Sequence, residues 1–317
     1  MQQSHPRPPN IAVELALLLT LATLWGASYS FIKIGVTTIP PVTLIAARTL
    51  IAGLLLLVIM RWRGITLPMD AATWRRFLWQ ACLNSVIPWT MLAWSVRSLD
   101  AGLATILNST SPIFTFFLTL AITRHEALAP RKLFGVCAGM AGICLIVGVE
   151  ALGGLGQQLV AQIVAVLAAI CYAGAAIFGR SFKGLDPMAP AAGSLLAGAA
   201  ILIPLSLAVD RPWTLAPSAS SMLALLVLAV FSTALAFVIY FRLVQTLGSV
   251  GTTAQAYLRV PIGVAVGVVF LGESLTTTAW IGLGCVVVGV AAMTIPERKT
   301  AVAGMTESYA RNESTSA

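Results

Sequence analysis

The chain consists of two copies of one hydrophobic pattern, and this repetition constrains its fold more than any single motif. When residues 1–149 are shifted forward by 147 positions, residues of the same kind meet at both ends of the repeat. The aligned pairs are Trp25 and Tyr172, Phe31 and Phe178, Lys33 and Arg180, Pro40 and Pro187, Glu126 and Glu273, Leu128 and Leu275, Gly135 and Gly282, and Gly142 and Gly289. Between these blocks the offset is 149, which aligns Gly102 with Gly251 and Pro112 with Pro261.

The composition excludes a soluble domain. Hydrophobic residues make up 58% of the chain and charged residues only 9%, and the mean hydropathy is +0.93. A soluble domain carries about 25% charged residues. Each copy of the repeat contains five apolar spans, most of which approach the ~20 residues needed to cross a bilayer as a helix. Because five is odd, the second copy must enter the membrane upside down, as in the inverted repeats of secondary transporters.

We therefore predict an all-α polytopic membrane protein with ten transmembrane helices, arranged as two five-helix inverted repeats around a central cavity. Residues 1–10 form a cytoplasmic tail, residues 11–149 the first repeat, residues 157–296 the second repeat, and residues 297–317 a disordered cytoplasmic tail. The predicted spans cover residues 12–36, 40–60, 74–96, 101–122, 131–149, 157–180, 187–208, 220–245, 249–271 and 277–295.

The net charge of +8 reflects membrane topology and does not indicate a nucleic-acid partner, because the basic residues follow the loops. With the N-terminus inside, the cytoplasmic segments hold fourteen Lys and Arg residues, and the opposite side holds three, which are Lys33, Arg97 and Arg211. An excess of this kind marks the cytoplasmic side. Both termini are predicted to be cytoplasmic.

Acidic residues are informative because none of the eleven lies in the middle of a predicted span. The two histidines, His5 and His125, lie in a tail and a loop, and the five cysteines have no metal-ligand spacing. An intramembrane enzyme needs paired carboxylates, a metal site or an activated nucleophile at depth. We therefore predict no enzyme, no metal site, no cofactor and no coupling carboxylate at the midplane.

Arg259 lies near the middle of span nine, where a guanidinium costs roughly 2.5–3.5 kcal/mol on insertion scales. Gly251, Gln255 and Arg259 are four residues apart and share one helix face. Two interpretations are equally open: the guanidinium binds a substrate carboxylate in a water-filled cavity, or it is a structural group bonded to carbonyls freed by Pro261. Arg48, in the middle of span two, has no basic counterpart in the repeat, and we favour a structural or interfacial role for it.

Prolines interrupt the spans at positions where polar residues gather. A proline within a helix leaves a carbonyl without its hydrogen bond, and a membrane tolerates this only beside a cavity, water or another polar group. Pro112 follows a polar run that includes Asn108, Pro261 follows Gln255, and Pro88 follows Asn84. We predict that these three prolines break or gate the helices, although simple kinked packing helices remain the alternative.

Aromatic and amide side chains complete the predicted substrate site. Trp25 and Tyr172 are repeat-equivalent and deep in their spans, so they are better candidates than a lone membrane aromatic, which usually faces lipid or packs. The predicted substrate-binding residues are Trp25, Tyr29, Asn84, Trp89, Asn108, Tyr172, Tyr240, Gln255, Tyr257 and Arg259.

These features resemble the ten-helix EamA-type family of the drug/metabolite transporter superfamily. The resemblance rests on the stretch W-G-A-S-Y-S-F-I-K from Trp25 to Lys33, A-A-R at Ala46–Arg48, the two Gly…Pro helices of spans four and nine, and L-G-E-S-L at Leu271–Leu275. It implies that spans one to four and six to nine surround the cavity, that spans five and ten are peripheral, and that the protein exports small metabolites across the bacterial inner membrane. Aromatic cavity candidates suggest the YddG-like exporters of aromatic and hydrophobic amino acids.

The expected function is therefore export of hydrophobic or aromatic amino acids by alternating access without a coupling carboxylate. A carrier of phosphorylated or nucleotide-linked metabolites is the alternative, which would need several cations in the cavity. The expected partners are a small-molecule substrate and the lipid bilayer. The sequence does not determine the oligomeric state, and a monomer would be sufficient.

Overall fold

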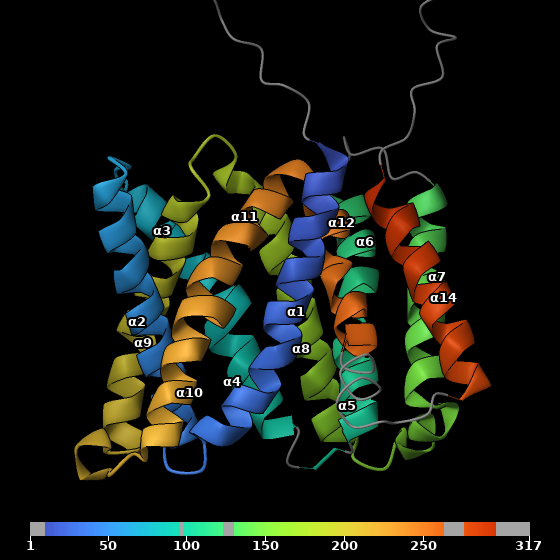
Figure 1. Ribbon diagram of the computed structural model, residues 1–317, viewed down its shortest axis with the longest axis horizontal. Helices are drawn as coiled ribbons and strands as arrows, with labels where there is room; N and C mark the ends of the chain where they lie inside the picture. Colours follow the sequence, from blue (N-terminus) through green and yellow to red (C-terminus); the bar gives the residue numbers. More distant parts are fainter. Residues whose placement is uncertain (1–9, 96–97, 100, 123–129, 263–275, 296–317) are drawn as a thin grey trace, which may run out of the picture.

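The computed structural model describes residues 10–95, 98–99, 101–122, 130–262 and 276–295, and every element within these ranges is a helix. The predicted all-α fold is confirmed (Figure 1). Eight stretches of the described chain are long and apolar enough to cross a membrane. Span three falls outside this set and carries Arg75 and Arg76 in its first turns, while span nine runs into residues 263–275, which lie outside the described residues. The predicted tails also lie outside them, apart from Asn10.

The five spans of the first half follow the predicted order. They are α1 (Ile11–Gly35), α2 (Pro41–Trp62), the composite α3 (Ala71–Ala81), η1 (Cys82–Val86) and α4 (Ile87–Ser95), the pair α5 (Ala101–Asn108) and α6 (Ser111–Ile122), and α7 (Pro130–Val147). A short 3-10 helix, η2 (Val149–Gly154), leads into the second half.

The second half repeats the same order. Its spans are α8 (Leu159–Gly179), α9 (Met188–Val209), the composite α10 (Ala219–Ala229), η5 (Val230–Leu235) and α11 (Ala236–Thr246), then α12 (Gly248–Thr253) with a helix over residues 255–262, and α14 (Thr277–Thr294). The 3-10 turns η3 (Arg180–Phe182) and η4 (Pro212–Thr214) lie in the connections.

Polar side chains start several of these helices by accepting N–H groups that the helix itself leaves unpaired. Asn10 accepts the N–H of Ala12 at the start of α1, and Ser218 and Thr276 do the same for α10 and α14. Asp70 accepts the Thr73 N–H at 2.8 Å at the start of α3, and this hydrogen bond lowers the pKa of its exposed carboxyl.

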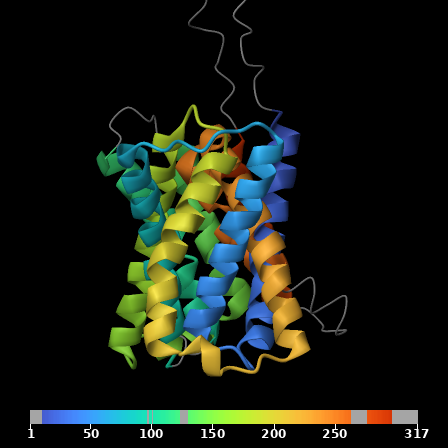
Figure 2. The ribbon, with the colours of Figure 1, turned by 90° about the vertical axis from the view of Figure 1, so that its left-hand side faces the viewer.

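Repeat-equivalent helices pack on each other at both edges of the bundle. Figures 1 and 2 show α2 beside α9 at one edge, and Figure 1 shows α7 beside α14 at the opposite edge. The remaining spans lie between these two pairs. Spans five and ten are thus peripheral, as the sequence predicted, and spans two and seven form an outer pair of their own.

Glycines bring α7 and α14 into backbone contact, and their pairing reveals the inverted symmetry. A Cβ built on Gly135 would lie 2.6 Å from the carbonyl oxygen of Gly289, and one built on Gly142 would lie 2.6 Å from that of Gly282. Gly135 is equivalent to Gly282 in the repeat, and Gly142 to Gly289, so each glycine meets the counterpart of the other. Such crossed pairing arises when two equivalent helices are antiparallel around a two-fold axis.

Both composite spans contain a π-helical segment at the same place in the repeat. In η1 the N–H of Ile87 bonds to the carbonyl of Cys82, five residues earlier, and in η5 the N–H of Ala236 reaches Phe231 in the same way. Pro88 explains part of the first segment, because it cannot donate to the carbonyl of Asn84. The second segment has no proline, but the Thr233 hydroxyl donates to the Leu228 carbonyl at 2.8 Å. Single-turn π segments often occur at functional sites.

The basic residues gather at one end of the bundle. Arg61 lies in the last turn of α2, Arg131 and Lys132 in the first turn of α7, and Arg180 directly after α8. This is also the end at which α1 begins and α14 ends (Figure 1). Arg211, in the connection after α9, lies at the opposite end.

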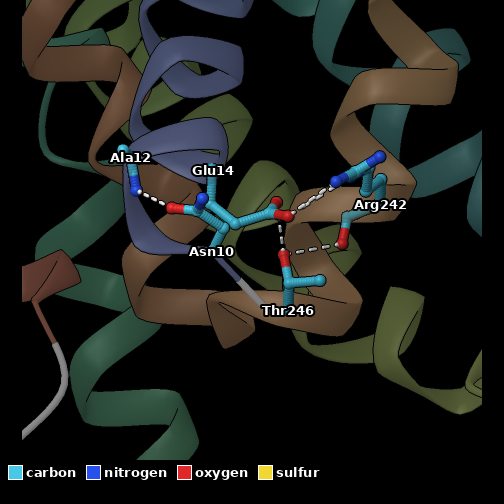
Figure 3. A network of polar contacts seen from close by, with 5 residues as sticks. All are labelled: Asn10, Ala12, Glu14, Arg242 and Thr246. Carbon is cyan, nitrogen blue, oxygen red and sulfur yellow. Dashed lines mark hydrogen bonds and ion pairs between the residues drawn. The ribbon is translucent and has the colours of Figure 1, made fainter. Parts of the chain in front are cut away.

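An ion pair joins the two halves at this basic end (Figure 3). Arg242 of α11 donates to Glu14 of α1, with its terminal nitrogen 2.9 Å from the carboxylate, and the Thr246 hydroxyl donates to the other carboxylate oxygen at 2.9 Å. Glu14 is only 1% exposed, whereas Arg242 is 47% exposed. The carboxylate is therefore buried and depends on its two partners for compensation.

We expect Gly289→Ala to destabilise the protein, because its methyl group would lie 2.6 Å from the Gly139 nitrogen and 2.7 Å from the Gly135 carbonyl oxygen. Overpacking of this kind costs about 1–3 kcal/mol. Gly284→Ala on the same helix is the matched control, since a Cβ there meets nothing within 4 Å. Thermal unfolding in detergent should show a lower midpoint for the first variant alone, and equal midpoints would contradict the close crossing.

Removal of Arg242 should leave the Glu14 carboxylate buried without its charge partner. We expect Arg242→Ala to lower the free energy of unfolding by about 1–3 kcal/mol, less than for a fully buried pair because Arg242 is half exposed. The double variant Glu14→Gln with Arg242→Ala should recover part of this loss, because a neutral amide is cheaper to bury. Strictly additive losses in thermal unfolding would argue against coupling between these side chains.

Candidate functional site

A small cavity lies between the two halves. Its empty volume, counted with the solvent space at its mouth, is about 350 Å³. Spans one, three, four, six, eight and nine supply its lining, which consists of Trp25, Asn84, Asn108, Ser111, Tyr172, Tyr240, Thr253, Gln255, Ala256 and Arg259. These spans form three repeat-equivalent pairs, whereas none of the described lining residues comes from α2, α7, α9 or α14.

Span four is broken where it meets the cavity. Helix α5 ends at Asn108 and α6 begins at Ser111, and both of these residues line the cavity. Pro112 cannot donate to the carbonyl of Asn108, and the N–H of Ile113 bonds to Thr110 at 2.9 Å, three residues earlier, and not to Ser109. The carbonyls of Asn108 and Ser109 therefore lack the donors that a continuous helix would supply.

Span nine is broken at a different place. Helix α12 ends at Thr253, a turn follows at Ala254, and the next helix begins at residue 255. Pro261 lies within that second helix, seven residues after the turn. In the first half the break directly precedes Pro112, so the two spans are equivalent in sequence but not in the position of their breaks.

This turn divides the predicted Gly251–Gln255–Arg259 face. Gln255 and Arg259 line the cavity, and the Arg259 Nε donates to the Gln255 Oε1 at 2.8 Å. Gly251 instead lies beside α14, since a Cβ there would be 3.7 Å from the carbonyl oxygen of Met293.

Arg259 is held on the face of a tryptophan. Its guanidinium carbon lies 4.9 Å from the ring centroid of Trp25, a cation–π contact. The Trp25 ring is fixed by its N–H, which donates to the Ser232 carbonyl at 3.2 Å. Only the Nε of Arg259 is hydrogen-bonded within the described residues, which leaves the terminal nitrogens for a ligand.

Two polar atoms in the cavity wall, the Asn84 Nδ2 and the Asn108 Oδ1, are buried and have no hydrogen-bond partner among the described residues. Asn84 is only 4% exposed. Burying a polar group without a partner costs free energy, and native proteins rarely leave several in one place. Their concentration around one cavity indicates a site that takes a polar ligand or water.

Aromatic rings connect Arg48 with Arg259. The Trp25 centroid lies 6.3 Å from that of Phe237, which in turn lies 6.5 Å from that of Trp89. The Arg48 guanidinium carbon lies 4.4 Å from the Trp89 centroid, and its Nε donates to the Thr233 Oγ1 at 3.0 Å. Arg48 is 5% exposed and does not line the cavity. Its contacts agree with the structural role that we favoured.

Seven of the ten predicted binding residues meet at the cavity, and two others, Trp89 and Tyr257, do not line it. Trp89 packs under Arg48. Tyr257 is fully buried, with its ring on Gly139 of α7 and its hydroxyl donating to the Val136 carbonyl at 3.1 Å. The side chain of Tyr29 lies outside the described residues.

Three lining residues were not among the predicted ones. Ser111 belongs to the polar run before Pro112, and its position next to the break could have identified it. Ala256 lies three residues before Arg259, so helical spacing could have placed it on the same face. Thr253 ends α12 before the turn at Ala254, and helical spacing from Arg259 does not identify it. The π segments left no signal that sequence analysis detected.

The described residues contain no group of His, Cys, Asp and Glu suited to a metal ion. No carboxylate is among the described side chains that line the cavity. Within the described part of the chain, the site thus offers one cation, neutral amides and hydroxyls, and aromatic surface.

Comparisons with known proteins agree with this architecture. The EamA-like transporter family matches residues 13–148 and again residues 159–295. Escherichia coli YedA, named as an uncharacterized inner membrane transporter, is 28% identical over 88% of this chain and 89% of its own length. A probable terminal-alkyne amino-acid exporter of Streptantibioticus cattleyicolor is 26% identical over 90% of this chain and 93% of its own length. A solved crystal structure at 18% identity matches with a TM-score of 0.74, covering 89% of this chain and 97% of that one, which supports the fold.

We expect Ser111→Cys to react with a small charged thiol reagent in a variant free of the five native cysteines, because Ser111 lines the cavity. Thr115→Cys, one turn further along α6, is the matched control, since Thr115 is fully buried away from the cavity lining. Equal labelling of both positions, measured by mass spectrometry, would contradict the cavity boundary.

Proposed function

The chain belongs to the EamA-like transporter family, and from this premise we propose that it exports hydrophobic and aromatic amino acids by alternating access. Membership makes it a membrane transporter of small molecules. Its relatives include a probable amino-acid exporter, which supports the proposed substrate class.

The observation that carries the proposal is the pairing of Arg259 with Trp25 in the cavity. A guanidinium with free terminal nitrogens can bind a carboxylate through two parallel hydrogen bonds. The rings of Trp25, Tyr172 and Tyr240 offer apolar surface beside it. Of the two interpretations of Arg259, this one is favoured because its side chain lines the cavity, whereas that of Arg48, which has similar contacts, does not.

Transport without a proton or sodium relay follows from the same lining. A coupled carrier needs a titratable or anionic group that meets the ion near the midplane, and the described cavity lining has no carboxylate. The substrate gradient would then drive movement of the two halves. A current driven by a pH gradient alone would contradict this mechanism.

The orientation in the membrane rests on charge. The end of the bundle that carries Arg61, Arg131, Lys132 and Arg180 also carries the start of α1 and the end of α14. With the positive end inside, both termini are cytoplasmic in the bacterial inner membrane, which is where YedA is named as residing.

A carrier of phosphorylated metabolites is the second candidate, and Arg48 is the observation that favours it. This buried arginine is a second cation within the predicted membrane spans. Arg48 does not reach the cavity lining, however, so one phosphate would have to be bound by Arg259 alone. We therefore rank this function second.

The test is exchange in proteoliposomes preloaded with unlabelled amino acid. We expect labelled phenylalanine, tryptophan, leucine and methionine to exchange, and lysine and glutamate not to. Arg259→Ala should reduce exchange at least tenfold, because the carboxylate loses a charged hydrogen-bond partner. Arg259→Lys should retain part of the activity, since it keeps the charge but loses the fork.

Arg75→Ala is the control, because Arg75 is an exposed residue of α3 outside the cavity. Normal exchange by Arg259→Ala would remove the proposed anchor. Exchange of phosphorylated metabolites and of no amino acid would establish the second candidate instead.

A further inference from the structure

We infer that the break between α5 and α6 binds the α-ammonium group of the substrate, with the Asn108 side-chain oxygen as its acceptor. This inference rests on the proposed amino-acid substrate. It extends that proposal by assigning the second charge of the zwitterion to a named site.

The inference begins with charge balance. A zwitterion enters the cavity with a carboxylate and an ammonium group, and removal of either from water is costly unless it is paired. Arg259 can take the carboxylate. No carboxylate lies among the described side chains that line the cavity, so neutral oxygen atoms and aromatic faces are the described groups available to the ammonium group.

Asn108 supplies such an oxygen. Its Oδ1 is buried in the cavity wall and has no hydrogen-bond partner within the described residues. A cavity that leaves a buried acceptor unpaired is prepared for a donor from the ligand. An ammonium group carries three N–H donors and no acceptor, which matches this requirement.

The backbone at the break adds further acceptor capacity. Pro112 deprives the Asn108 carbonyl of its helical donor, and the N–H of Ile113 turns to Thr110, which frees the Ser109 carbonyl as well. Asn108 is also the last residue of α5, and the C-terminal end of a helix carries partial negative charge. Unwound carbonyls and half-helix C-termini hold cations in other transporters with broken helices.

The part of the cavity lining that span nine supplies has the complementary character. Span nine restarts at residue 255, so Gln255 and Arg259 stand in the first turns of a helix, whose N-terminal end favours anions. Asn84 lines the same cavity and is only 4% exposed. Its Nδ2 is a donor without a partner among the described residues, and it can bind the second carboxylate oxygen. The two broken spans thus present opposite ends of their helices, one suited to each charge.

This arrangement predicts which compounds are excluded. A free α-amino group is required, so the protein should discriminate against carboxylates of the same shape that lack it or carry it acylated. Without an ammonium group, the Asn108 oxygen would stay buried and unpaired, and such mismatches give strong discrimination.

The experiment measures competition for labelled phenylalanine exchange in proteoliposomes, using phenylalanine, 3-phenylpropionate and N-acetylphenylalanine. We expect the two analogues to compete at least tenfold more weakly than phenylalanine with the unmodified protein. Asn108→Leu should weaken competition by phenylalanine roughly 10- to 100-fold and leave competition by 3-phenylpropionate unchanged, because only the ammonium contact is lost. Asn108→Asp keeps the acceptor and should preserve the preference for phenylalanine.

Thr110→Val is the matched control at the same break. The Thr110 hydroxyl donates to the Leu107 carbonyl at 2.6 Å and is not among the described groups that line the cavity. The Thr110→Val variant should therefore prefer phenylalanine over the two analogues to the same degree as the unmodified protein. If Asn108→Leu fails to fold, two measurements still test the ammonium site: competition by the two analogues in the unmodified protein, and the preference of Asn108→Asp for phenylalanine.

The outcomes separate the two proposals. Equal competition by 3-phenylpropionate and phenylalanine in the unmodified protein would overturn the ammonium site and leave amino-acid export standing. The ammonium site would also be overturned if Asn108→Leu weakened competition by phenylalanine and by 3-phenylpropionate to the same degree. Absence of exchange with every amino acid in the unmodified protein would overturn the proposed function and this inference with it.

Discussion

Backbone hydrogen bonding in a membrane is the constraint on which this structure depends. No water is present in the hydrocarbon region to compensate an unpaired N–H or carbonyl, so the chain must be helical wherever it faces lipid. Departures from regular helix are therefore expected only beside a cavity. Within the described spans, the π segments η1 and η5, the break at Asn108–Ser111 and the turn at Ala254 all lie in spans that line one cavity. The irregular backbone and the polar side chains have the same cause, since both need partners other than lipid.

The inverted repeat provides the frame, and the two halves then differ in chemistry. Helices α7 and α14 cross through paired glycines, and Tyr257 packs on Gly139, which ties the helix that bears Arg259 to this peripheral pair. The first half contributes the amides of Asn84 and Asn108 to the cavity, while the second contributes the guanidinium. A symmetric scaffold with asymmetric lining can alternate between two faces and still hold a zwitterion in one orientation.

Arginine within the predicted spans is compatible with this fold because each of the two guanidinium groups has an aromatic face and a hydrogen-bond acceptor. Arg48 has Trp89 and the Thr233 hydroxyl, and Arg259 has Trp25 and the Gln255 amide. The difference between them is access: Arg259 lines the cavity, and Arg48 does not. At the basic end of the bundle, the Glu14–Arg242 ion pair joins the halves where no such cavity is needed.

The sequence by itself determined the membrane class, the all-helical fold, the order of the spans and the family resemblance, because hydropathy and internal repetition are local properties of the chain. It also selected most of the cavity lining, since a polar residue deep in an apolar span has few other reasons to be there. Only the tertiary structure decided which of two neighbours on span nine reaches the cavity. Arg259 does, whereas Tyr257, two residues earlier, points to α7. That outcome depends on the turn at Ala254 and on the contacts of Tyr257 with Gly139 and the Val136 carbonyl of α7, which lie more than a hundred residues earlier in the chain.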